Sequence, residues 1–160
     1  MNEPLDFCRV KKISDKGYGF LKSLYYPGDI FFHFSQIKKE EFLDKLNLMK
    51  RGDFFLYFIS SVARDNRRQV RELWYSLASV PPHYIPAFSA TIASCFNTDN
   101  VNLFDLLHAF SELRNIGYND PVFIETILTS KKIIKLPTTI MPFLNADEIR
   151  RLDEILHTRS

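Results

Sequence analysis

The chain has 160 residues, a formal net charge of +2, 46% hydrophobic residues and 14% aromatic residues. This length suits one domain or two small ones, and the composition is that of a folded globular protein rather than of a disordered chain. The two cysteines, Cys8 and Cys95, form no CxxC pair, so the sequence indicates neither a disulfide framework nor a zinc site, and we expect a cytoplasmic protein.

The charge is distributed unevenly between the two halves of the chain. Residues 1–76 hold fourteen Lys or Arg against ten Asp or Glu, a net charge of +4, whereas residues 77–160 hold seven against nine, a net charge of −2. The first half therefore suits an anionic partner better than the second. The longest uncharged run, 73–98, is interrupted by three prolines and many polar residues, so we expect no membrane span.

Five short segments of the first half have the composition of β-strands. They cover residues 7–13, 18–21, 30–34, 54–59 and 69–75. No long helical pattern separates them, which favours a small Greek-key barrel. The fourth segment is apolar on both faces, so it needs a cover from residues 84–160, and we assign the covered outward face to Phe54, Leu56 and Phe58.

Aromatic side chains recur at alternate positions in the second and third segments, KGYGFL (16–21) and DIFFHFS (29–35). Residues two apart in a strand point to the same face, so these segments predict a row of rings on one side of two neighbouring strands. Ile30 and Phe32 would point the other way, into the core. Exposed rows of rings are uncommon in proteins, and stacking on unpaired bases is a direct use for one.

These two motifs, in this order and at this separation, resemble the RNP1-like and RNP2-like motifs of the cold-shock domain. That family is an OB-type five-stranded barrel that binds single-stranded RNA and DNA, and the resemblance extends more weakly over about residues 5–76. It implies single-stranded RNA, in preference to DNA, as the partner. The residues that it implies are the stacking rings Tyr18, Phe20, Phe31, His33, Phe34 and Phe42, and the phosphate-facing Lys16. We expect Lys12 and Lys22 to lie near phosphates as well.

The chain departs from the family pattern in three places. Lys12-Ile13 stands where the family usually has a tryptophan followed by a phenylalanine, so one stacking ring is missing. The segment 37–52 is about four residues longer than the family loop, and Tyr25 and Tyr26 add rings to a loop that is usually polar. Because each stacked base contributes ~1–3 kcal/mol, we expect the missing ring to weaken binding without abolishing it.

After residue 84 the hydrophobic period changes from two to 3.6, which predicts four or five helices. Apolar residues between 103 and 116 form an amphipathic helix that Gly117 ends, and Asp120-Pro121 begins the next one. Asn145 and Glu148 predict a capping box for the last helix. The expected fold class is thus α+β: an OB-type barrel over residues 1–76, a linker at 77–83, and an all-α bundle of unknown role over 84–160.

The sequence does not favour an enzyme. Asp105, His108 and Glu112 share one helix face and would allow a metal site, but the polar face of a helix often produces such a set by chance. No Gly-rich phosphate loop and no paired nucleophile and base are evident, so we expect no cofactor. The arginines at 64, 67, 68 and 71 are explained equally well by a solvated hairpin tip and by contact with phosphates.

Two functions stay open from the sequence. In the first, the barrel holds single-stranded RNA, or single-stranded DNA, and acts as an RNA chaperone or a post-transcriptional regulator. In the second, the protein is a protein–protein adaptor: the barrel is a scaffold whose ring face is covered, and the helical domain recruits a partner or self-associates. A row of large rings can serve either purpose.

Overall fold

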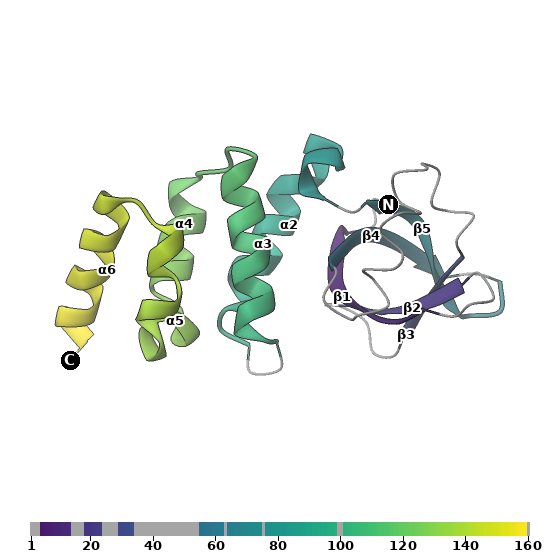
Figure 1. Ribbon diagram of the computed structural model, residues 1–160, viewed down its shortest axis with the longest axis horizontal. Helices are drawn as coiled ribbons and strands as arrows, with labels where there is room; N and C mark the ends of the chain where they lie inside the picture. Colours follow the sequence, from purple (N-terminus) through teal and green to yellow (C-terminus); the bar gives the residue numbers. More distant parts are fainter. Residues whose placement is uncertain are drawn as a thin grey trace. The chain divides into compact units, whose positions relative to one another are not determined.

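The computed structural model describes residues 4–13, 18–23, 29–33, 55–62, 64–74, 76–98 and 101–159. Along the chain, strands come first and helices follow, so the protein is of mixed α and β structure (Figure 1). The chain divides into two compact units, Met1–Phe88 and Ser89–Ser160. The division falls within the helix that covers Ile85–Cys95.

The first unit contains five strands within its described residues, and each lies within three residues of a predicted segment. They are β1 (Asp6–Ile13), β2 (Tyr18–Lys22), β3 (Asp29–His33), β4 (Phe55–Val62) and β5 (Arg68–Trp74). Their order is β1-β2-β3-β5-β4, and β4 pairs back with β1, so the sheet curls and closes on itself (Figure 1). The predicted α+β chain with a curled five-stranded sheet is confirmed.

The strand register separates the sheet into an inner and an outer face. Leu21 pairs with Ile30, and Gly19 pairs with Phe32, so these positions share one face. Ile30 and Phe32 are 1% and 0% exposed, as the sequence predicts for core residues. Leu56, Phe58 and Val70 are buried with them, and this set defines the inner face.

The outer face of β4 is covered by the first turn of the helix α2 (Ile85–Cys95). Phe7 pairs with Tyr57 in register, and their rings are stacked with centroids 5.7 Å apart. The ring of Phe88 meets both edge-on, at centroid distances of 5.8 Å from Phe7 and 5.7 Å from Tyr57. All three side chains are buried, so these rings form a second small core outside the barrel.

The predicted cover of this strand is therefore present, but the predicted face is wrong. Tyr57 is the residue under Phe88, whereas Leu56 and Phe58 belong to the inner face, and Phe54 lies outside the described residues. Every residue of 54–59 is apolar, so the alternation that normally identifies a face is missing from the sequence. A shift of one residue then exchanges the two faces of a strand.

The helices of the described chain follow α2. They are α3 (Leu103–Asn115), α4 (Pro121–Leu128), α5 (Lys131–Lys135) and α6 (Ala146–Arg159). The 3-10 turns Leu77–Ser79 and Pro82–Tyr84 precede α2, and Pro137–Thr139 and Met141–Phe143 lie between α5 and α6. Among the described residues, no helix combines the length and the apolar character that a membrane span requires. The prediction of four or five helices after residue 84 is confirmed for these residues.

The predicted helix ends are confirmed by their hydrogen bonds. Gly117 has a φ of 85°, and the N–H groups of Gly117 and Tyr118 donate to the carbonyls of Arg114 and Leu113, which is a Schellman motif. The carboxylate of Asp120 accepts from the N–H of Val122 at 3.1 Å.

At the start of α6 the capping is reciprocal. The side chain of Asn145 accepts from the N–H of Glu148 at 2.8 Å, and the carboxylate of Glu148 accepts from the N–H of Asn145 at 2.9 Å. The predicted capping box is thus formed.

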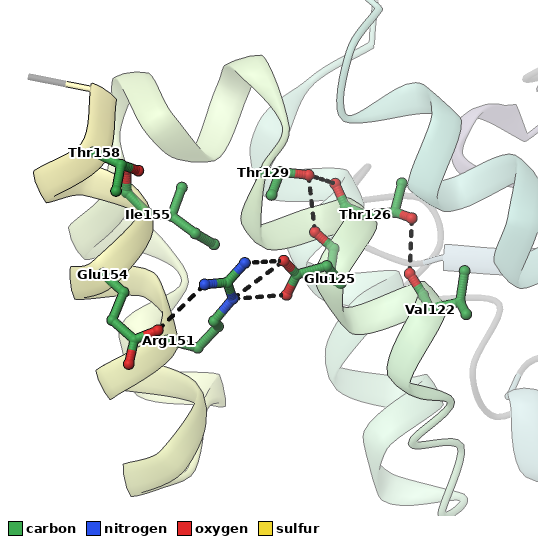
Figure 2. A network of polar contacts seen from close by, with 8 residues as sticks. All are labelled: Val122, Glu125, Thr126, Thr129, Arg151, Glu154, Ile155 and Thr158. Atoms are coloured by element: carbon green, nitrogen blue, oxygen red, sulfur yellow. Dashed lines mark hydrogen bonds and ion pairs between the residues drawn. The ribbon is translucent and has the colours of Figure 1, made fainter.

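Polar contacts join the helices of the second unit around its apolar core. Arg151 on α6 donates to both carboxylate oxygens of Glu125 on α4, through Nε at 3.1 Å to each and through Nη2 at 2.5 Å, as Figure 2 shows. Arg151 also donates through Nη1 to Glu154 at 3.2 Å. Hydrogen bonding to Arg151 lowers the pKa of Glu125, although burial works against this effect.

Candidate nucleic-acid interface

Two aromatic rings of the predicted row lie side by side on the outer face of the barrel. Phe20 on β2 is opposite Phe31 on β3 in register. Both lie on the outer face, because the residues that alternate with them, such as Phe32, point into the core. The two rings meet edge-to-face, with centroids 6.0 Å apart and an interplanar angle of 69°. Both side chains are partly exposed, so part of each ring can be reached from solvent.

The strand register also aligns further predicted site residues with this pair. Tyr18 is opposite His33, two residues from Phe20 and Phe31 along the same strands, and Lys22 is opposite Asp29. Lys12 of β1 is opposite Phe20. For Lys12, Tyr18, Lys22 and His33 the structure describes the backbone alone, and three other predicted positions lie outside the described residues: Lys16, Phe34 and Phe42.

The rings of Phe20 and Phe31 form one wall of an open depression with a volume of about 1100 Å³. The rest of its lining comes from β4, β5 and the hairpin between them: Ser61, Val62, Arg64, Asp65, Arg67, Arg68, Gln69 and Arg71. The parallel pairing of Phe31 with Gln69 brings β5 beside the rings. The depression therefore brings aromatic rings and arginine side chains onto one surface.

The hairpin between β4 and β5 has a defined local structure in its described residues. Asn66 adopts a φ of 65°, a left-handed conformation that asparagine tolerates better than most residues. The carboxylate of Asp65 accepts from the N–H of Arg67 at 3.1 Å. Arg68 donates through Nη1 to both the carbonyl and the hydroxyl of Ser60, each at 3.2 Å, which holds this guanidinium against the barrel wall.

The charge of the depression is positive, since its lining carries four arginines and one aspartate. Arg64, Arg67 and Arg71 are exposed. Arg67 is 3.8 Å from Asp65, an exposed ion pair that contributes little stability and can be exchanged for another anion. A guanidinium donates in a planar fork that matches phosphate and also stacks on bases. This surface thus places aromatic rings and guanidinium groups in one lining.

Sequence reasoning gave equal weight to two explanations of these arginines, and it did not place them beside the rings. The signal was present, because four arginines fall between positions 64 and 71. Their position depends on the pairing of β3 with β5, which joins residues distant in sequence and leaves no local pattern.

The three residues that the sequence suggests as metal ligands, Asp105, His108 and Glu112, all lie on α3. Nε2 of His108 is 3.4 Å from a carboxylate oxygen of Glu112, one helical turn away. Within the described part of the chain, no group of three His, Cys, Asp or Glu side chains is arranged to hold a metal ion.

Comparisons of this chain with protein-family models, with curated proteins and with solved structures find no match.

Proposed function

We propose that the barrel binds single-stranded nucleic acid, RNA in preference to DNA, by stacking bases on Phe20 and Phe31 while the hairpin arginines hold the phosphates. The observation that carries this proposal is the open depression in which the two partly exposed rings and four arginines share one lining. Rings alone would suit many partners, and arginines alone would suit any anion. Their combination is what a single strand requires.

The strands that supply the lining support the proposal. OB-type barrels bind oligonucleotides on the face of strands 2 and 3, between the loops that join strands 1 to 2 and 4 to 5. Here the rings come from β2 and β3, and the arginines come from β5 and the β4–β5 hairpin. The motifs around these rings are the ones that resemble the cold-shock domain, and the preference for RNA rests on that resemblance.

The size of the expected affinity follows from the same residues. One stacked base contributes ~1–3 kcal/mol, and micromolar binding requires about 8 kcal/mol. Phe20 and Phe31 therefore need help from the phosphates and from the rings predicted at Tyr18 and His33. A protein that binds in this way holds bases unpaired, so it would destabilise RNA hairpins, as an RNA chaperone or a post-transcriptional regulator in the cytoplasm does.

The direct test is a salt titration of binding to fluorescein-labelled oligo-uridine, measured by anisotropy. Wild-type protein should bind at low salt and lose affinity as salt rises, because phosphate contacts release counterions. The double variant Phe31→Ala/His33→Ala should lose most of its affinity at every salt concentration, because stacking depends little on salt. Phe104→Ala, which removes an exposed ring from α3, is the matched control and should bind as wild type does.

The arginines are tested by the slope of the same titration. For a single strand, each lost phosphate contact should reduce the slope of log K against log salt by about 0.7. We expect this reduction for Arg64→Ala and for Arg71→Ala, but not for Arg150→Ala, which removes an exposed arginine of α6. Equally poor binding by wild type and by the double ring variant at low salt would refute the proposal. A parallel series with oligo-thymidine measures the preference for RNA.

A second candidate function, the protein–protein adaptor, is favoured by two exposed apolar side chains of the helical unit. Phe104 on α3 is 68% exposed and Val122 on α4 is 72% exposed. Exposed apolar side chains mark a protein contact where they join into one patch, and the double variant below tests these two together. If the adaptor hypothesis is right, the protein will not bind oligo-uridine, and Phe104→Ser/Val122→Ser will abolish a concentration-dependent association that sedimentation equilibrium detects for wild type.

A further inference from the structure

Three further rings form a cluster at the end of β5. Trp74 is the last residue of the strand, and His83 and Tyr84 belong to the 3-10 turn that follows the connection. The centroids of Trp74 and Tyr84 are 5.9 Å apart, and those of His83 and Tyr84 are 4.2 Å apart with an interplanar angle of 35°. We refer to these three residues, which all lie in the first unit, as the β5-end cluster.

The backbone that carries this cluster is fixed by burial and by proline. Leu77 and Val80, in the connection after β5, are buried at 1% and 5% exposure. Pro81 and Pro82 restrict the backbone directly before the rings, and the N–H of Tyr84 donates to the carbonyl of Pro81 at 3.1 Å. The rings are therefore held in place before any ligand arrives, which lowers the entropy cost of binding one.

The cluster also presents an open ring surface. Trp74 and Tyr84 are partly exposed, and His83 is exposed. The ring of His83 lies against that of Tyr84 at a tilt of 35°, and the exposed side chain of His83 is accessible to solvent. If these rings served only to seal the end of the sheet, burial of all three would be expected, whereas none of them is buried.

β5 connects this cluster to the depression. Gln69 of β5 is opposite Phe31, and Trp74 is opposite Tyr57, which places both on the outer face. Trp74 lies five residues after Gln69 along the strand, a path of about 17 Å. Arg71 is exposed along this path and also lines the depression. A strand of nucleic acid that leaves the depression along β5 would pass this arginine and reach the rings.

We propose that the β5-end cluster is a second stacking site for a base of the same single strand, several nucleotides from the base on Phe20 and Phe31. This inference rests on the proposed function of the barrel and adds a site and a minimum ligand length to it. The ligand is a nucleobase of any identity, because every base offers a π-face. The strand that fills both sites must be long enough to follow β5.

Two oligo-uridines distinguish one site from two. Oligonucleotides of about 4 and about 12 nucleotides fall within the site sizes of about 4–16 nucleotides known for OB folds. The longer one should bind wild type about 10- to 100-fold more tightly, which corresponds to one more stacked base. Trp74 is the single tryptophan of the chain, so its fluorescence reports on the cluster without any substitution. The longer oligonucleotide should quench it, and the shorter one should not.

His83→Ala provides the variant, because an exposed side chain can be removed with little effect on folding. The variant should bind the shorter oligonucleotide as wild type does, but its gain in affinity for the longer one should be mostly lost. His157→Ala, an exposed histidine of α6, is the matched control and should behave as wild type.

The second site is overturned by the following result. Wild type binds both oligonucleotides, but His83→Ala keeps the full gain in affinity for the longer one, and the emission of Trp74 does not change. Absence of binding to either oligonucleotide by wild type overturns the proposed function itself, and the second site with it. The two failures are therefore distinguishable in one experiment.

Discussion

Arg114 on α3 donates two hydrogen bonds, of 2.7 and 2.6 Å, to the two carboxylate oxygens of Glu148 on α6. The side chains are 18% and 14% exposed, and the guanidinium carbon of Arg114 lies 5.7 Å from the centre of the Phe110 ring. The same carboxylate closes the capping box with Asn145. One acidic side chain therefore joins two helices and also begins one of them.

We predict that Glu148→Ala is among the most destabilising polar substitutions of the helical unit. It leaves the guanidinium of Arg114 largely buried without its partner and removes the cap, which together should lower the free energy of unfolding by about 3 kcal/mol. Urea denaturation measures the change. Asp147→Ala, at the neighbouring exposed position, should change it by less than about 0.5 kcal/mol. Equal effects of the two substitutions would contradict the role of the buried pair.

The contact between Glu125 and Arg151 predicts a pH dependence of stability (Figure 2). Since hydrogen bonding to Arg151 lowers the pKa of Glu125 below its usual 4.5, the folded state binds this proton less readily than the unfolded state does. The resulting stability is present above about pH 4.5 and is lost as the pH falls through the lowered pKa. The contribution is small, because the two side chains are 45% and 47% exposed and water screens the pair.

The measurement compares wild type with Glu125→Gln by urea denaturation at about pH 7 and about pH 3. At the higher pH the variant should be the less stable protein, and at the lower pH the difference should shrink, because the carboxyl of Glu125 is then protonated in the unfolded state and part of the contribution of the ion pair is lost. Asp153→Asn, an exposed acid on α6, serves as the control. A difference of the same size at both pH values would show that the ion pair is not its cause.

Gly117 provides a prediction about backbone conformation alone. Its φ of 85° is unfavourable for residues with a side chain, yet a Cβ added there would meet no other atom within 4 Å. Gly117→Ala should therefore lower the free energy of unfolding by about 1–2 kcal/mol through backbone strain without any clash. Gly117→Asn should cost less, because asparagine tolerates this conformation. Equal losses for alanine and asparagine would indicate a different cause.

The elements of this fold were predictable because their signals are local. The change of hydrophobic period near residue 84, the Asp120-Pro121 start and the pairing of Asn145 with Glu148 each involve residues within one turn of each other. The ring pair of Phe20 and Phe31 was predictable for the same reason, since alternation along two neighbouring strands places both on one face.

The remaining features depend on contacts between residues distant in sequence. The face of β4 that Phe88 covers could not be read from an unbroken apolar run. The approach of Arg71 to Phe31 requires β5 to pair with β3 in parallel, and the approach of Tyr84 to Trp74 requires the chain to turn back after Val80. Neither arrangement has a pattern in the sequence, because it is set by packing.

The position of Phe88 determines where the barrel can be separated from the helices. The proline-rich stretch 77–83 looks like the natural place to end a fragment, but a chain ending there would lose the ring that covers Phe7 and Tyr57. Two large side chains of β1 and β4 would then face water, and such a fragment would aggregate rather than report on binding. An isolated barrel for RNA-binding work should retain the first turn of α2 through Phe88.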